Sequence, residues 1–393
     1  MDHVTRRLVV GLGMSQLLCW GISYYLVGVF GGAMAADLGQ SLTAIHGGFT
    51  VALIVQGLTS SRIGHLIDQR GGRPVMVAGS LVMAASLLGL AAAREMIGYY
   101  AAWVGLGLAM RLTLYDAAFA ALARIGGRDA RRPIAQITLL GGLASSVLWP
   151  VGQALADALG WRGALCVYAG IALLTIPLHL GIPTHRHIPA PAPEPTSQPG
   201  DATGSGPSDP APLAAILYAL IVALNGLLNS GLSAHMIGLM AGLGMAPALA
   251  VWVSTLRGVG QSAARLGEVL FGGRLSPFTL AVLASGLVAF CFLPPLLGMS
   301  IPLGIAFALL FGAGNGLLTI VRGTLPLALF DPASYGRTVG RLVTPGFFIA
   351  ALAPMLYAFV IERFGDAAAL WLSLGCAILV VVASLLLKAR FGR

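Results

Sequence analysis

The stretch GHLIDQRGGR, residues 64–73, is a short polar connection between two long apolar runs of the chain. The run before it covers residues 42–63 and the run after it covers 74–93. Each is close to the length of a helix that crosses a lipid bilayer, about 20 residues. The same alternation of apolar run and polar connection continues in both directions, and it predicts an all-α membrane protein.

Twelve apolar runs of this kind are predicted to be transmembrane helices. The first has features of a signal peptide, because it follows Arg6 and Arg7 and contains the small-residue pattern AMAA at 33–36. Its apolar core is much longer than the roughly 7–15 residues of a signal sequence, so we predict an uncleaved helix. The predicted spans are 8–34, 42–63, 74–93, 97–122, 134–158, 163–183, 212–236, 246–270, 277–297, 301–329, 338–361 and 367–388.

The composition agrees with a membrane protein. Of the 393 residues, 57% are hydrophobic and 9% are charged, whereas a soluble globular protein carries about 25% charged residues. The mean hydropathy is +0.88. The 53 glycines suit closely packed membrane helices, and the four cysteines lie singly in apolar segments, as small buried hydrophobic residues do.

The net charge of +9 is distributed as a topology signal rather than as a nucleic-acid-binding surface. With the N-terminus in the cytoplasm, the outer loops hold only Arg94, Arg162 and Arg363. By the positive-inside rule, both termini are then predicted to be cytoplasmic. The basic residues at cytoplasmic ends and loops would be Arg6, Arg7, Arg62, Arg70, Arg73, Arg124, Arg128, Arg131, Arg132, Arg186, Arg265, Arg274, Arg337, Arg341, Lys388, Arg390 and Arg393.

A segment rich in Pro, Gly and Ser, residues 184–211, divides the predicted helices six and six. We predict that it is a disordered cytoplasmic linker between an N-terminal bundle, 1–183, and a C-terminal bundle, 212–393. The halves repeat short patterns in the same order, at offsets near 200 residues, which indicates a duplication with parallel repeats. The matching stretches are 62–73 with 265–274, 105–115 with 312–322, and 141–150 with 345–354.

The loop at 64–73 resembles the signature loop of the major facilitator superfamily, and with twelve spans the resemblance covers the whole chain. Gln69 and Gly72 depart from the pattern, each replacing a usual basic residue. The stretches YDAAF (115–119) and GNGLLTIVRGTLPLALF (314–330) resemble a poorly characterised bacterial branch of the family. This resemblance does not indicate a substrate. The residues that match the loop pattern are Gly64, Asp68, Gly71 and Arg73.

This resemblance implies two pseudo-symmetric six-helix bundles and a secondary active transporter that works by alternating access. It implies a monomer in the bacterial inner membrane that moves a small molecule by exchange or by coupling to an ion, such as the proton, without a cofactor. In this family the loop aspartate, here Asp68, helps to hold the cytoplasmic ends of the two halves together at the positive N-terminal end of helix eleven.

Ionisable residues inside membrane spans are functional candidates, because each charge costs about 2.5–3.5 kcal/mol at the bilayer centre. The set here is Arg111, Asp116, Arg257 and Arg322. Three arginines against one aspartate favour an anionic substrate, since a guanidinium binds a carboxylate through two parallel hydrogen bonds. We expect Arg257 on helix eight to contact it, as a basic residue often does in organic-anion members of the family. The alternative is a charge pair that only joins helices.

Helical geometry orients the charged segment MRLTLYDAAF, residues 110–119. On a continuous helix Arg111 and Tyr115 share a face, whereas Asp116 points away from Arg111. We therefore predict that Arg111 and Tyr115 face a central cavity and that Asp116 pairs with Arg322 across an inner gate. Uncharged residues predicted to line this cavity, or alternatively to form interhelical hydrogen bonds, are Tyr24, Tyr25, Gln56, Asn225, Asn229 and Asn315.

Other function classes fit less well. A membrane enzyme would need a catalytic motif, and the sequence holds neither HExxH nor GxSxG, nor a cluster with metal-ligand spacing. A receptor without transport would be expected to carry an added soluble domain. Within transport, a proton-coupled exporter of drugs or toxic compounds stays an alternative. The stretch WPVGQ at 149–153 lacks the glycine before proline that is found in helix five of many drug–proton antiporters.

Overall fold

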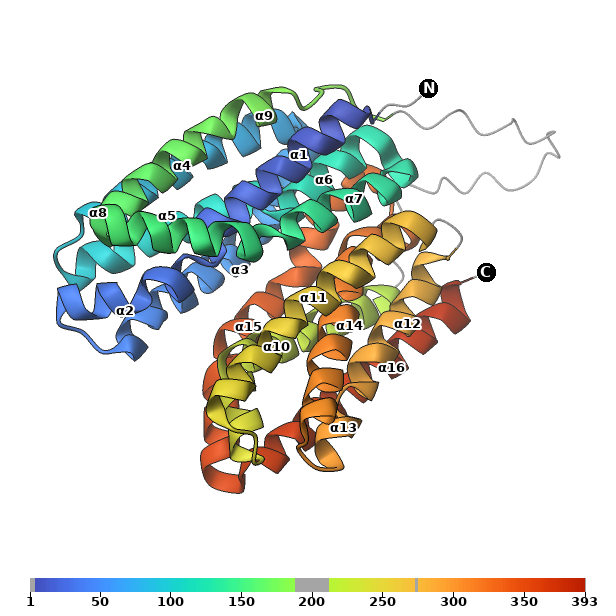
Figure 1. Ribbon diagram of the computed structural model, residues 1–393. Coiled ribbons are helices and arrows are strands. Elements are labelled where there is room, and N and C mark those ends of the chain that lie inside the picture. The colour runs from blue at the N-terminus through green and yellow to red at the C-terminus, as the bar shows by residue number, and fades with distance from the viewer. Residues whose placement is uncertain (1–3, 188–211, 273–274, 393) are drawn as a thin grey trace.

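The computed structural model describes residues 4–187, 212–272 and 275–392, and these are almost wholly helical, with no strand among them (Figure 1). Most of the predicted linker, and Arg274 and Arg393 of the cytoplasmic set, lie outside these residues. The helices are α1 (Arg6–Cys19), α2 (Leu26–Leu38), α3 (Leu42–Arg70), α4 (Gly72–Ala92), α5 (Met96–Thr113), α6 (Tyr115–Gly126), α7 (Arg131–Gly142), α8 (Ala144–Leu174), α9 (Ile176–Leu180), α10 (Pro212–Gly242), α11 (Pro247–Phe271), α12 (Pro277–Phe290), α13 (Leu293–Leu296), α14 (Ile301–Leu329), α15 (Tyr335–Phe364) and α16 (Asp366–Phe391).

The predicted spans correspond to this architecture. In the described part of the chain, 9 helical stretches are long and apolar enough to cross a membrane. One of them, Met96–Leu180, is 85 residues long and holds three predicted spans. The helix α11 has 25 residues and completes the set; its three charged residues, Arg257, Arg265 and Glu268, make it more polar than the others.

Several spans are interrupted, which hydropathy does not reveal. The first span consists of α1, a π-helical turn Trp20–Tyr24 (η1), and α2. The fourth breaks between α5 and α6 at Leu114, whose backbone is extended (φ −76°, ψ −171°). The fifth breaks between α7 and α8 at Leu143, whereas Gly160, with a left-handed φ of 70° inside α8, lies at the predicted boundary between the fifth and sixth spans.

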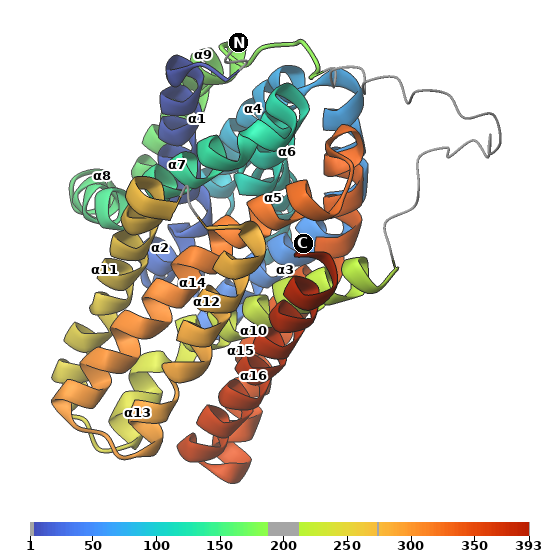
Figure 2. The same cartoon turned by 90° about the vertical axis from the view of Figure 1, so that its right-hand side faces the viewer.

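The helices form two bundles, one from the residues before 188 and one from the residues after 211 (Figures 1 and 2). The bundles pack against each other chiefly through α3 with α15 and α7 with α11. Figure 1 shows them close together at the end where both chain termini lie and diverging toward the opposite end. We call these the packed end and the open end.

Backbone contact between glycines holds the packed end together. A Cβ on Gly64 of α3 would lie 1.9 Å from the carbonyl oxygen of Gly336 on α15, so a side chain at this position has no room. Next to this crossing, the Asp68 carboxylate accepts hydrogen bonds from the backbone N–H groups of Gly336 (2.8 Å) and Arg337 (2.7 Å). The first turn of a helix carries unpaired N–H groups and partial positive charge, so α15 stabilises this carboxylate.

Candidate functional site

A cavity lies between the two bundles, next to the packed end. Its walls come from the first span, α3, α6 and α7 on one side and from α10, α11, α14 and α15 on the other. The space open to the centre of a water-sized molecule is about 190 Å³. One water needs about 10–15 Å³ by this measure, so the cavity has room for a small organic molecule.

The structure brings most of the predicted site residues together. Arg111 and the signature-loop residues do not line this cavity. Whether the residues that line it bind a substrate stays a prediction. The predicted residues found in the lining are Tyr24, Tyr25, Gln56, Tyr115, Asp116, Asn225, Asn229, Arg257, Asn315 and Arg322.

An aromatic wall covers the N-terminal side of the cavity. Trp20 lies at its centre, with ring centroids 4.7 Å from Tyr24 and 4.9 Å from Tyr115. The π-helical turn sets this geometry: the N–H of Tyr25 bonds to the carbonyl oxygen of Trp20, five residues earlier, at 3.3 Å. The extra residue in the turn shifts the register between α1 and α2, as π-bulges often do at functional sites. The sequence analysis selected the tyrosines but missed Trp20.

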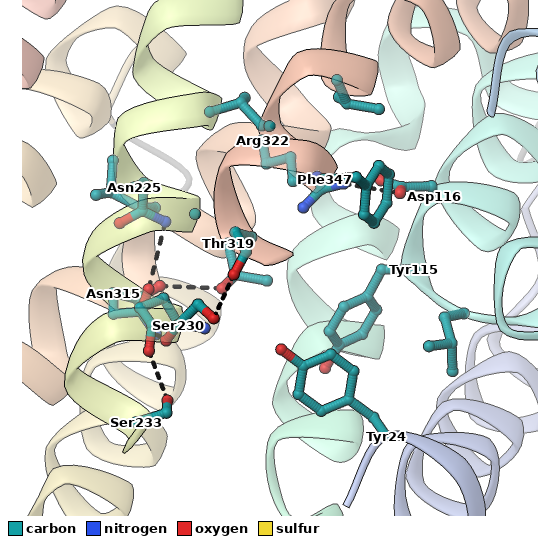
Figure 3. A pocket seen from close by; sticks show the side chains of 18 of the residues that line it. Tyr24, Tyr115, Asp116, Asn225, Ser230, Ser233, Asn315, Thr319, Arg322 and Phe347 are labelled. Atoms are coloured by element: carbon teal, nitrogen blue, oxygen red, sulfur yellow. Dashed lines mark hydrogen bonds and ion pairs between the residues drawn. The ribbon is translucent and has the colours of Figure 1, made fainter. Parts of the chain in front are cut away.

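A polar wall faces it from α10, α11 and α14. Asn225 donates to Asn315 (3.3 Å), and Asn315 donates to the carboxamide oxygen of Asn229 (2.8 Å). Ser230 and Ser233 lie on the same stretch of α10 (Figure 3). The two asparagines of α10 are thus joined through Asn315 of α14.

Arg257 is half-buried at this wall. Its guanidinium donates to Asn229 Oδ1 (2.5 Å) and Ser233 Oγ (2.9 Å), and it lies 4.9 Å from the ring centre of Phe311. All these partners are electrically neutral. No carboxylate of the described residues forms an ion pair with it. The cation is thus held in place without being neutralised.

The predicted contact between Asp116 and Arg322 is present. Arg322 Nη2 donates to Asp116 Oδ2 at 2.7 Å, which joins α6 of one bundle to α14 of the other. Figure 3 shows the pair beside Phe347, above the space between the two walls. Of the described residues that line the cavity, Asp116 is the only acidic one.

The expected position of Arg111 is wrong. Its guanidinium is 2% exposed and donates to the hydroxyl (3.0 Å) and the carbonyl oxygen (3.1 Å) of Ser60 on α3. It also approaches Asp116 Oδ2 to 3.9 Å, although a continuous helix would point these residues apart. The break at Leu114 explains the difference, because it turns α6 out of line with α5. Asp116 lies in the first turn of α6, where the helix dipole favours a carboxylate.

Arg265 lies in a position that the charge distribution did not predict. Its side chain is 2% exposed and lines the cavity from α11, rather than lying in a loop. It donates to the carbonyl oxygen of Thr138 on α7 at 2.9 Å, across the junction of the two bundles. The hydroxyl of Tyr115 donates to the same oxygen at 3.2 Å. The eight-residue spacing from Arg257, which places both arginines on one face of a helix, was a signal that could have identified it.

The rest of the signature loop lies at the packed end. Gly71 ends α3 with a left-handed φ of 85°, a conformation that favours glycine. Arg73 Nε donates to the carbonyl oxygen of Ile182 at 2.6 Å, within the first bundle. Together with the contacts of Asp68 to α15, the loop therefore both shapes the first bundle and joins it to the second. Nearby, Arg131, the first residue of α7, contacts Glu268 of α11 in the second bundle at 3.8 Å.

Known proteins identify the family. The profile described as Major Facilitator Superfamily matches residues 12–220, more than half of the chain. The chain belongs to the major facilitator superfamily. A curated relative, the multidrug resistance protein MdtL of Klebsiella pneumoniae (strain 342), is 29% identical over 180 residues. The match covers 44% of this chain and 43% of MdtL, so the chain spans less than half the length of this relative.

Solved structures of the superfamily share the architecture along nearly the whole chain. The human organic anion transporter MFSD10 (TETRAN) has a TM-score of 0.73 at 18% identity and covers 96% of this chain and 99% of its own. The proton:xylose symporter XylE, bound to 6-bromo-6-deoxy-D-glucose, has a TM-score of 0.75 at 11% identity, with coverages of 98% and 95%. These matches confirm the major facilitator fold of two pseudo-symmetric helical bundles. The chain is accordingly a multi-pass membrane protein of this superfamily.

Proposed function

We propose that this transporter carries a small organic anion, such as a carboxylate, across the bacterial inner membrane as a monomer. The observation that supports the proposal is the un-neutralised guanidinium of Arg257 in the cavity, held by Asn229 and Ser233. Placing such a charge away from water is costly unless a partner compensates it. A substrate carboxylate is the compensating partner, and it matches the two-pronged donor geometry of a guanidinium.

The charges around the cavity agree with this substrate class. Arg257, Arg265 and Arg322 line it against Asp116 alone among the described lining residues. Since Asp116 is engaged by Arg322, the remaining positive charge is available to a ligand. MFSD10, whose title names an organic anion transporter, has the same fold, which supports the proposal only at the level of architecture.

The transport cycle follows from the two ends of the molecule. If the termini lie in the cytoplasm, as the basic residues predict, the packed end faces the cytoplasm and the cavity faces outward. Alternating access then requires the packed end to separate while the open end closes. Exchange or coupling to an ion would drive the cycle. Asp116 is the candidate proton carrier, since it is the acidic group at the cavity.

Arg257 provides the test. Purified protein in lipid nanodiscs is screened by thermal shift against small carboxylates, phosphates, amino acids, sugars and cationic drugs, because a bound ligand raises the melting temperature. We expect carboxylates to stabilise the protein and Arg257→Lys to weaken their binding despite keeping the charge. Arg257→Gln should weaken it by roughly 10- to 150-fold, the loss of a charge-assisted hydrogen-bonded contact.

The control is Arg363→Gln, which removes an exposed arginine at the far end of α15. It should leave carboxylate binding unchanged. Normal binding of carboxylates by both Arg257 variants would refute the proposal.

Drug export is the second candidate. The partial match to a multidrug resistance protein favours it, and so does the aromatic wall, since such surfaces accept varied apolar compounds. The same screen separates the two functions. Stabilisation by cationic drugs, sensitive to Asp116→Asn and insensitive to Arg257→Gln, would indicate an exporter of cations.

A further inference from the structure

The two walls of the cavity differ in chemistry, and we propose that the substrate is an aromatic carboxylate. Its ring would pack against Trp20, Tyr24 and Tyr115, while its carboxylate reaches Arg257 on the opposite wall. This inference rests on the proposed transport of an organic anion and specifies which kind of anion the site fits. Binding of an anion by Arg257 does not by itself explain why the opposite wall is aromatic. An aromatic substrate gives that wall a role.

The aromatic wall is preorganised for a planar apolar group. Behind Trp20 and its two neighbours, Phe49 meets Tyr24 edge to face at 4.8 Å, and Phe119 stacks on Tyr115 at 5.4 Å. Rings held on both sides keep their orientation when the cavity is filled. Edge-to-face and offset contacts favour another aromatic ring over an aliphatic group of similar size.

The polar wall is organised to leave one cation for the ligand. The carboxamide oxygen of Asn315 accepts from Asn225, and that of Asn229 accepts from both Asn315 and Arg257. These oxygens are occupied by donors within the wall, whereas the guanidinium of Arg257 keeps its charge. A carboxylate, which is negatively charged and only accepts hydrogen bonds, fits this guanidinium better than a neutral alcohol does.

The opposed placement of the walls favours an aromatic acid over two simpler ligands. Figure 3 shows Tyr24 and Tyr115 across the cavity from Asn225, Ser230, Ser233 and Asn315, with the Tyr24 hydroxyl directed toward the polar side. A sugar would require polar partners on both walls, and a short aliphatic acid would leave the aromatic wall in contact with water. A ring joined to a carboxylate by a short chain contacts both.

Four matched probes test this with the full-length protein in nanodiscs, by calorimetric titration. They are 3-phenylpropionate, 3-cyclohexylpropionate, butanoate and 3-phenylpropan-1-ol. We expect 3-phenylpropionate to bind roughly 10- to 150-fold more tightly than butanoate, because it buries a phenyl group. It should bind roughly 2- to 12-fold more tightly than the cyclohexyl acid, because its ring meets aromatic neighbours.

Variants of one wall residue complete the test. Tyr24→Leu should lose most of the preference for the phenyl over the cyclohexyl acid and leave butanoate unaffected, whereas Tyr24→Phe keeps the preference. Phe359→Leu removes an aromatic ring that is 61% exposed on α15, away from the cavity, and serves as the matched control. If the Tyr24→Leu protein does not fold, the affinities of the four probes for the unmodified protein decide the test.

The outcomes separate this inference from the proposed function. If butanoate and the cyclohexyl acid bind as tightly as 3-phenylpropionate, with all three sensitive to Arg257→Gln, the aromatic preference is wrong and anion transport stands. If 3-phenylpropan-1-ol binds as tightly as the acid and Arg257→Gln changes nothing, the anion site itself is wrong.

Discussion

Replacing Asp116 by asparagine should shift the transporter toward the state in which the packed end is separated. Asp116 on α6 and Arg322 on α14 belong to different bundles, and their contact of 2.7 Å exists only while these helices lie together. The substitution removes the attraction from this state alone. The substitution changes the free energy of the opposite state little, because the two residues are apart in that state.

The size of the shift follows from the burial of the pair. Removing one partner of a fully buried ion pair costs about 3–5 kcal/mol. Here Arg322 is 31% exposed and Asp116 11%, so solvent screens part of the attraction. An asparagine also still accepts one hydrogen bond from Arg322. We therefore expect about 1–3 kcal/mol, a 5- to 150-fold change in the ratio of the two states.

Single-molecule energy transfer between the bundles measures this ratio. Fluorophores on Gln40→Cys and Ala248→Cys, both exposed at the open end, report its width once the four native cysteines are replaced. The Asp116→Asn protein should show a larger population with a short distance between the labels. Glu362→Gln removes an exposed carboxylate of α15 and should leave the distribution as it is. An unchanged distribution in Asp116→Asn would refute the reasoning.

Exchanging the charges of Asp116 and Arg322 gives a stricter version of this test. The neighbouring Arg111 limits how far the exchange can restore the original distribution. Combining Asp116→Arg with Arg322→Asp restores opposite charges across the bundles. It also places a new guanidinium next to Arg111, whose Nη1 lies 3.9 Å from the Asp116 carboxylate. Recovery should be partial, and adding Arg111→Gln should increase it. A double variant no better than the worse single variant would show that the cross-bundle contact is not what holds this state.

Three further substitutions test the junction of the bundles. Asp68→Asn leaves one oxygen to accept from the N–H groups of Gly336 and Arg337, so one of the two bonds is lost at a cost of roughly 1–3 kcal/mol; it should impair transport while sparing carboxylate binding, measured in proteoliposomes and by thermal shift. Gly64→Ala places a methyl group 1.9 Å from the Gly336 carbonyl oxygen and should shift the energy-transfer distribution strongly toward the short distance. Arg265→Gln loses the 2.9 Å bond to the Thr138 carbonyl and should reduce both this packing and the affinity for carboxylates, by roughly 10-fold.

The sequence was sufficient for the spans and for the contact between Asp116 and Arg322. Long apolar runs have one structural solution in a bilayer, because backbone groups must bond within the segment. The loop at 64–73 and the repeat of its pattern in the second half implied the two bundles. The pair of Asp116 with Arg322 was predictable because both are charged, both lie deep in spans, and the repeat relates helices four and ten.

Arg265 could not be placed in this way. Basic residues near the end of a span satisfy the positive-inside rule whether they lie in a loop or reach into a cavity, since only depth and rotation along the helix separate the two cases. Its carbonyl partner on Thr138 belongs to the other bundle and carries no sequence signal, as every residue has a carbonyl group. Packing between the bundles therefore decides its role.

The interruptions of the spans are the features that could least be predicted from the sequence. Hydropathy cannot detect the π-helical turn at 20–24 or the extended residue at 114, because the residues involved are as apolar as the helix around them. Yet the first of these turns sets the aromatic wall, and the second brings Asp116 near Arg111 while Tyr115 faces the cavity. A break in a membrane helix is tolerated where it is buried in protein or lines a cavity. These two breaks lie beside the cavity, and an unbroken helix would separate Asp116 from Arg111.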